Sequence, residues 1–151
     1  MINDTNSFLQ NLDPDNNFFN EVYFGKGENS LYYSVDSYNK TFQNSKNLKI
    51  FHLNIRSFRA NFDLFNSTLA TLCDFPDIVC LTETWFSSDS LDINLLDGFS
   101  SFHTVRPDNM RGGGVSIFIR DQLNAFKLPK LSICNDKIET CAIRVTLKNF
   151  D

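Results

Sequence analysis

The stretch Leu48–Trp85 constrains the fold most, because two short apolar runs flank a segment with helical periodicity. The first run, Leu48–Leu53, has the composition of a central strand covered on both faces. After Ser57, a good N-cap residue, five apolar residues recur with the 4-3-4-3 spacing of one helical face: Phe58, Phe62, Phe65, Leu69 and Leu72. The second run, Ile78–Leu81, is too short for a helix and fits a buried strand. We therefore predict a strand, a helix packed on a sheet, and a second strand.

Two polar residues follow these predicted strands, Asn54 after the first and Glu83 near the end of the second. A crossover of this kind joins parallel strands, so both strands end at one edge of the sheet and the two side chains should meet there. Ligands of such sheets bind outside the carboxyl ends of the strands, and an amide beside a carboxylate suits Mg²⁺ and a phosphate bound to it. The alternative is that Asn54 caps the following turn and Glu83 is an ordinary acid at a strand end.

Three motifs carry a resemblance to a known family: Leu53–Ser57 (LNIRS), Leu81–Trp85 (LTETW) and Arg111–Val115 (RGGGV). In this order they resemble the endonuclease/exonuclease/phosphatase superfamily, and most of all the apurinic-endonuclease-like domain of non-LTR (LINE-type) retrotransposons. Three motifs in one order are a far more specific signal than any one of them alone. The resemblance covers Leu48–Leu147.

The resemblance implies an α/β fold, a two-sheet sandwich, and Mg²⁺-dependent cleavage of a DNA phosphodiester. It assigns Asn54 to the phosphate and metal site and Glu83 to metal binding. One departure concerns Arg56, since apurinic endonucleases of the family often carry an acid two residues after the asparagine. An arginine there repels a second cation and can bind a phosphate, so a single-metal site or a purely DNA-binding role stays open.

A second departure concerns residues that the family places further along the chain: a tyrosine, an aspartate and asparagine pair, and an aspartate and histidine pair. None has a counterpart in this sequence. One strand-end carboxylate is not expected to hold Mg²⁺ firmly, because this ion keeps its water shell and needs more negative charge around it. We therefore expect an incomplete sandwich without its C-terminal half-domain, inactive alone, with Mg²⁺ weakly bound or absent.

The run Gly112–Gly114 precedes another compact apolar strand, Val115–Ile119. Glycines can let a backbone approach phosphate, but they also allow a tight strand entry with positive φ, which we favour. No P-loop is indicated, because the lysine and the helix start are missing. Arg111 is the better candidate for contact with substrate phosphate, in a locally basic segment between His103 and Arg120 whose alternative is a solvated loop.

Residues 1–47 differ in composition from residues 48–151. They hold ten asparagines and all four tyrosines, and six acids against three lysines give them a charge of −3. We interpret 1–47 as a polar leader that ends in a linker, Asp36–Asn47, and 48–151 as the N-terminal part of the endonuclease-like domain. The aromatic clusters of the leader indicate weak docking on the domain or a neighbouring module.

The sequence shows no signal peptide and no long apolar run. We expect an intracellular protein that does not use a membrane, and a nuclear one if it acts on genomic DNA. The net charge of −4 would repel a polyanion at long range, so binding of DNA depends on local basicity.

The rest of the chain gives weaker predictions. They are a short helix at Leu91–Leu96, a turn at Asp97–Gly98, strands at Phe99–Val105 and Ile138–Leu147, and a mixed connection at Gln122–Lys130. Among residues with possible chemistry, we expect His52 and His103 to be satisfied within the core, and Cys80 and Cys141 to act as small hydrophobes. Trp85 is expected to pack under the loops, with stacking on a base as the alternative.

The sequence thus predicts a nuclease site in the intact domain. Glu83 would hold the metal, Asn54 would position metal or phosphate, and Arg56 and Arg111 would contact substrate. Two alternatives remain: a phosphatase of the same superfamily, acting on lipid or nucleotide phosphates, and a non-enzymatic module that binds nucleic acid or protein.

Overall fold

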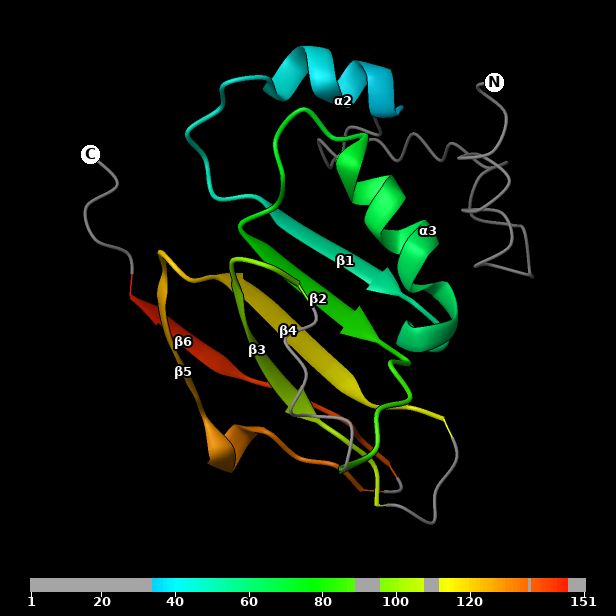
Figure 1. The fold of residues 1–151 in the computed structure, drawn as a ribbon. Helices are drawn as coiled ribbons and strands as arrows, with labels where there is room; N and C mark the ends of the chain where they lie inside the picture. Colours follow the sequence, from blue (N-terminus) through cyan, green and yellow to red (C-terminus); the bar gives the residue numbers. More distant parts are fainter. Residues whose placement is uncertain (1–33, 89–95, 108–111, 136, 147–151) are drawn as a thin grey trace, which may run out of the picture. The chain divides into compact units, whose positions relative to one another are not determined.

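The computed structural model describes residues 34–88, 96–107, 112–135 and 137–146 (Figure 1). Two compact units are distinguished within this part of the chain. One contains residues 34–46 and 63–75, and the other contains residues 47–62 and everything described from residue 76 onward. Both sheets and the predicted site residues that are described lie in the second unit.

A four-stranded sheet organises the second unit. In spatial order its strands are β1 (Ile50–Asn54), β2 (Ile78–Thr82), β4 (Val115–Arg120) and β3 (Phe99–Thr104). β1 and β2 are parallel, and the other two pairings are antiparallel. The predicted parallel crossover is therefore confirmed, and so are the strands predicted in these four segments.

β1 is an edge strand, which corrects the prediction of a central strand covered on both faces. In the described part of the chain only β2 pairs with it. Its side chains alternate between exposed and half-buried, and Ile50 is 62% exposed. His52 lies on the exposed side, so the expectation that it is buried in the core is also wrong. The number of neighbours of a strand is a tertiary property that its own composition does not reveal.

A second sheet of two antiparallel strands, β5 (Asn124–Lys127) and β6 (Ile143–Thr146), completes the unit (Figure 1). Ile78, Ile117 and Ile119 of the large sheet form a buried cluster, against which half-buried residues of the small sheet pack: Ala125, Ile143 and Val145. Two sheets therefore share one apolar layer. This confirms the α/β class with two packed sheets.

Two downstream segments differ from their predictions. The segment Gln122–Lys130, predicted as a mixed connection, contains the strand β5, and the 3-10 turn η2 (Pro129–Leu131) follows it. Only four residues long, β5 is too short to show a clear alternation, and β6 supplies the partner that fixes it. The strand predicted at Ile138–Leu147 is limited to β6, preceded by an isolated bridge between Cys134 and Glu139.

The helix α3 (Phe58–Ala70) follows β1, as predicted. The Ser57 hydroxyl accepts a hydrogen bond from the Ala60 backbone N–H at 3.4 Å, which confirms the predicted N-cap. The predicted apolar face is confirmed by burial: Phe58, Phe65 and Leu69 are buried, and Phe62 and Leu72 are half-buried. In the first turn, the Phe58 ring stacks on Phe118 of β4 with centroids 5.7 Å apart.

The helix α2 (Val35–Phe42) occupies most of the segment predicted as a linker, Asp36–Asn47. The Ser34 side chain caps it by accepting from the Ser37 backbone N–H at 3.2 Å. Within the same unit, the Asn39 amide donates to the Thr71 carbonyl at 2.8 Å and accepts from the Cys73 N–H at 2.7 Å. The prediction of a linker did not include this helix, whose half-buried residues recur at helical spacing: Val35, Tyr38, Asn39 and Phe42.

Two remaining predictions concern the connection into β3. The Asp97–Gly98 turn is confirmed, and Gly98 has a φ of +78°. The helix predicted at Leu91–Leu96 falls almost wholly outside the described residues. In the described part of the chain, no helix has the length and apolarity needed to cross a membrane.

Candidate functional site

Asn54 and Glu83 lie at the same edge of the four-stranded sheet, as the parallel crossover predicts. Asn54 is the register partner of Thr82, the residue that precedes Glu83. Backbone hydrogen bonds continue beyond the strands, because the Ile55 N–H donates to the Thr82 carbonyl at 3.0 Å and the Ser57 N–H to the Glu83 carbonyl at 2.8 Å. We call this edge, with the loops 54–57, 83–86 and 112–114, the rim.

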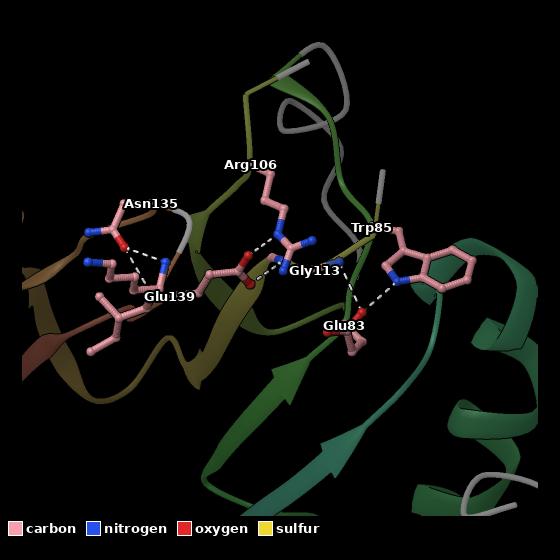
Figure 2. Close-up of polar contacts among 9 residues, drawn as sticks. Glu83, Trp85, Arg106, Gly113, Asn135 and Glu139 are labelled. Atoms are coloured by element: carbon pink, nitrogen blue, oxygen red, sulfur yellow. Dashed lines mark hydrogen bonds and ion pairs between the residues drawn. The ribbon is translucent and has the colours of Figure 1, made fainter. Parts of the chain in front are cut away.

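The Glu83 carboxylate is held by two donors on the same oxygen (Figure 2). The Trp85 indole N–H and the Gly113 backbone N–H each donate to Oε2 at 2.9 Å. Among the described residues none donates to Oε1. The indole hydrogen bond lowers the pKa of Glu83 most, the Gly113 N–H and the positive charges of Arg106 and Arg56 add to it, and desolvation opposes them. The carboxylate is therefore ionised near neutral pH, and within the described residues its hydrogen bonds are made through Oε2.

Left-handed backbone conformations gather in the rim. Of the five non-glycine residues with positive φ in the described chain, four are rim residues: Arg56, Ser57, Glu83 and Trp85, with φ of 45°, 85°, 55° and 56°. Each such conformation costs roughly 1 kcal/mol or more in a residue that has a Cβ. Strain of this kind persists only where the surroundings enforce it, and it is concentrated at functional sites.

Hydrogen bonds between the rim loops enforce this backbone. The Trp85 N–H donates to the Gly113 carbonyl at 2.9 Å, and the Thr84 N–H donates to the Gly114 carbonyl at 3.2 Å. On the other side, the Phe58 N–H donates to the Thr84 carbonyl at 3.0 Å. The 83–86 loop is thus hydrogen-bonded to both neighbouring loops.

The glycine run enters β4 with positive φ, as we favoured. Gly112, Gly113 and Gly114 have φ of 81°, 70° and 85°. Space demands glycine as well, because a Cβ on Gly114 would lie 2.9 Å from the buried Thr84 hydroxyl and one on Gly113 would collide with the Arg106 guanidinium. Because these residues have no side chain, their backbone N–H groups can approach the carboxylates of Glu83 and Glu139.

A pair that the sequence analysis did not single out lies beside the glycine turn. The Arg106 guanidinium forms an ion pair with Glu139, which raises the pKa of Arg106, and the other Glu139 oxygen accepts from the Gly114 N–H at 2.8 Å (Figure 2). Arg106 and Glu139 are far apart in the sequence, and neither belongs to a resembling motif. Only the basic character of the segment around Arg106 hinted at its role.

The other predicted site residues are placed as follows. Asn54 and Arg56 are both exposed at the rim. Asn61 of α3 was not predicted to take part. Its side-chain amide donates to the carbonyls of Ile55 and Arg56 at 2.9 and 3.0 Å and so holds the loop 54–57. Arg111 lies outside the described residues.

Comparison with known proteins decides the family. The endonuclease/exonuclease/phosphatase family profile matches residues 51–147, which is more than half of the chain. The chain belongs to the endonuclease/exonuclease/phosphatase family. The predicted superfamily is therefore confirmed, and its members include nucleases and phosphatases. No curated protein matches the sequence significantly.

Solved structures give two similarities. The catalytic domain of Xenopus laevis APE2 is 28% identical over 52% of this chain and 26% of its own chain, with a TM-score of 0.42. A variant of the 3′ phosphatase NExo from Neisseria, bound to a product DNA hairpin, is 23% identical over 67% of this chain and 38% of its own, with a TM-score of 0.47. This chain thus matches much less than two thirds of the length of either structure.

The rim fits a divalent cation only in part. Glu83 Oε1 and the Asn54 side-chain oxygen are oxygen donors of the type that Mg²⁺ takes, and the ion commonly uses one or two carboxylates with waters and phosphates. The Glu139 carboxylate is engaged by Arg106 and the Gly114 N–H. Within the described residues, no group of three or more His, Cys, Asp or Glu side chains could hold a metal.

Two further predictions on reactive residues have clear outcomes. His103 is half-buried between Phe86 and Phe118, and its Nδ1 lies 2.8 Å from the Ser116 hydroxyl. Burial, with the charge of Lys127, lowers its pKa to about 4, so it is a neutral core histidine. The prediction that it is satisfied in the core is confirmed for Nδ1 only, because the buried Nε2 has no hydrogen-bond partner among the described residues. Trp85 is 47% exposed, so the expectation that it packs under the loops is wrong, because its ring is bonded to Glu83 at the rim.

Cys80 and Cys141 behave as small apolar residues, as expected. All four are free thiols. Cys80 and Cys141 are half-buried in the layer between the sheets, and burial raises the pKa of both. They are therefore protonated near neutral pH and have no place in the rim.

Proposed function

We propose that this chain supplies the N-terminal part of a Mg²⁺-dependent DNA endonuclease of the kind found in non-LTR retrotransposons, which nicks a phosphodiester and is inactive alone. In the intact domain Glu83 holds the metal and Asn54 positions metal or phosphate. Arg56 and Arg111 contact the substrate. The observation that carries the proposal is the ionised Glu83 carboxylate, held through Oε2 by two N–H donors, at the same sheet edge as Asn54.

The rim supports this assignment electrostatically. A metal ligand must be deprotonated, and the donors on Glu83 keep its pKa below the ordinary value. Bound Mg²⁺ would supply neutralisation of the charge on the phosphoryl oxygens. Arg56 is exposed beside Glu83, and a guanidinium can bind two phosphate oxygens at once. Family membership is in accord with phosphodiester or phosphomonoester chemistry.

We expect the chain alone to be inactive because the rim has too little negative charge to hold Mg²⁺. Glu83 is opposed by Arg56 and Arg106 nearby, and Glu139 is engaged with Arg106. Mg²⁺ loses its water shell reluctantly and needs more negative charge than this to be held firmly. We therefore propose that a C-terminal half-domain adds further ligands and that DNA binds across both parts, in the nucleus if the target is genomic.

The test is a nicking assay on supercoiled plasmid. The chain joined to a matching C-terminal half-domain is expected to nick in Mg²⁺ and to stop when EDTA removes the metal. Glu83→Gln should abolish nicking. Asp63→Asn is the matched control, because it removes one exposed acid from α3 outside the rim and should nick like the parent. Nicking by Glu83→Gln at the rate of the control would remove the metal role.

A substrate panel separates the alternatives. Release of phosphate from lipid or nucleotide monoesters without nicking would favour the phosphatase. Binding of DNA or protein with no catalysis, and with no effect of metal, would favour the non-enzymatic module.

A further inference from the structure

Trp85 is the single tryptophan of the chain and the one large aromatic residue exposed at the rim. Aromatic side chains usually contribute buried area, yet 47% of Trp85 is exposed. Figure 2 shows the ring beside Glu83, on the side away from the Arg106–Glu139 pair. An exposed indole next to a candidate metal ligand calls for a physical reason.

The ring is fixed in this exposed position. Its N–H donates to Glu83 at 2.9 Å, and the backbone N–H of Trp85 donates to the Gly113 carbonyl at 2.9 Å. Gly112 lies against the N–H edge, where a Cβ would be 3.6 Å from Nε1. With φ of 56°, the Trp85 backbone is left-handed, which is unfavourable for a bulky residue. The surroundings therefore hold the ring still before any ligand arrives.

Charge makes an aromatic contact valuable here. The chain has a net charge of −4, so long-range attraction cannot draw in a polyanion. Arg56 is the exposed rim cation within the described residues. Stacking of a base on an aromatic ring needs no positive charge and tolerates any sequence, since every base has a π-face.

We propose that Trp85 stacks on an unpaired nucleobase beside the phosphate bound at the rim. The proposal rests on the proposed function and adds a substrate class to it. In an intact duplex the faces of the bases cover one another, so only a single-stranded or extruded base can offer a face to the ring. The site therefore prefers DNA with an unpaired base at the nick to fully paired DNA.

The competing account is that Trp85 serves only to orient Glu83. Two variants separate the ring from the N–H. Trp85→Phe keeps an aromatic face and loses the donor, whereas Trp85→Gln keeps an N–H donor and loses the face. If stacking matters, Gln should weaken the binding of a labelled single-stranded oligonucleotide about tenfold, and Phe should weaken it much less. If orientation alone matters, the order is reversed.

The parent chain reports on the contact directly, because its tryptophan fluorescence comes from Trp85 alone. A short single-stranded oligodeoxynucleotide should quench this emission. The same backbone built from abasic residues should not, even at concentrations where anisotropy of its own label shows it bound. Equal quenching by both, no quenching by a bound oligonucleotide, or no binding at all would overturn the stacking proposal.

The two proposals can fail separately. Nicking by the joined domain that requires Mg²⁺ and Glu83, together with unquenched fluorescence, refutes stacking and leaves the nuclease intact. Base-dependent quenching without nicking by the joined domain refutes the nuclease and leaves a base-binding rim.

Discussion

The two ends of the four-stranded sheet carry similar polar residues but use them differently. At the end away from the rim, Asp77 accepts from the Lys49 N–H at 2.8 Å and pairs with Arg120 at 3.5 Å. Arg120 also donates to the Pro76 carbonyl at 3.2 Å. Opposite charges there meet each other. At the rim, Glu83 accepts from neutral N–H groups through one oxygen, and Arg56 is exposed.

This difference separates a stabilising end from a binding end. Asp77 and Arg120 bind each other, so neither charge is available to a ligand. A carboxylate held by neutral donors stays charged and keeps its attraction for a cation. The left-handed backbone at the rim also favours a binding role, because backbone strain is concentrated at functional sites.

Glu83→Gln should produce the largest functional effect and a small effect on folding. Loss of the charged ligand should reduce nicking by the joined domain at least ~100-fold, since even residues that only support metal ligands contribute 10-fold to 100-fold. The amide oxygen of glutamine can still accept from Trp85 and Gly113, so the free energy of unfolding should change by less than about 0.5 kcal/mol. Plasmid nicking and urea denaturation measure the two quantities. A large loss of stability would make Glu83 a structural residue.

Gly114→Ala should give the largest loss of stability at the rim. The added Cβ meets the Thr84 hydroxyl and requires a left-handed alanine, so unfolding should become easier by about 2 kcal/mol or more. Gly98→Ala is the matched control, because Gly98 has a similar φ but open space around it, and about 1 kcal/mol is expected. Equal losses in urea denaturation would show that space at Gly114 does not matter.

Asp77→Asn should behave in the opposite way to Glu83→Gln. It weakens the partly exposed pair with Arg120 and the bond from Lys49, which should lower the free energy of unfolding by about 1 kcal/mol. Nicking by the joined domain should be unchanged at temperatures where the variant is folded. A loss of nicking without a loss of stability would show that Asp77 has a functional role, and would contradict the difference proposed between the two ends of the sheet.

The smallest effect concerns pH. The pKa of Glu83 is lower in the folded chain than in the unfolded chain, so its contribution to stability is present above the ordinary glutamate pKa and is lost as pH falls through the folded value. Trp85→Phe removes the main cause, so the pKa of Glu83 should rise toward its ordinary value. Carboxyl NMR titration measures this. An unchanged pKa would assign the shift to Gly113 and the nearby arginines.

The sequence predicts the part of the site that depends on local pattern and on one crossover. The two apolar runs and the helical spacing between them place Asn54 and Glu83 on one edge, because parallel strands end together. The glycine run before β4 predicts positive φ, because few other residues adopt it.

What the sequence misses depends on neighbours that are distant along the chain. The edge position of β1 follows from the number of its partners, and the exposure of Trp85 follows from its bond to Glu83. The Arg106–Glu139 pair joins residues 33 positions apart, and Glu139 is placed by its bridge to Cys134. Periodicity contains none of this information.

The most direct test of the rim is where a divalent cation binds. Trp85 gives the only tryptophan indole N–H resonance, and that N–H donates to Glu83. Paramagnetic Mn²⁺, added to the isotope-labelled chain as a substitute for Mg²⁺, should broaden this resonance before others, and Glu83→Gln should prevent the broadening. A sharp indole resonance, while amides around Asp77 or another acidic residue broaden first, would contradict the assignment of the metal to the rim.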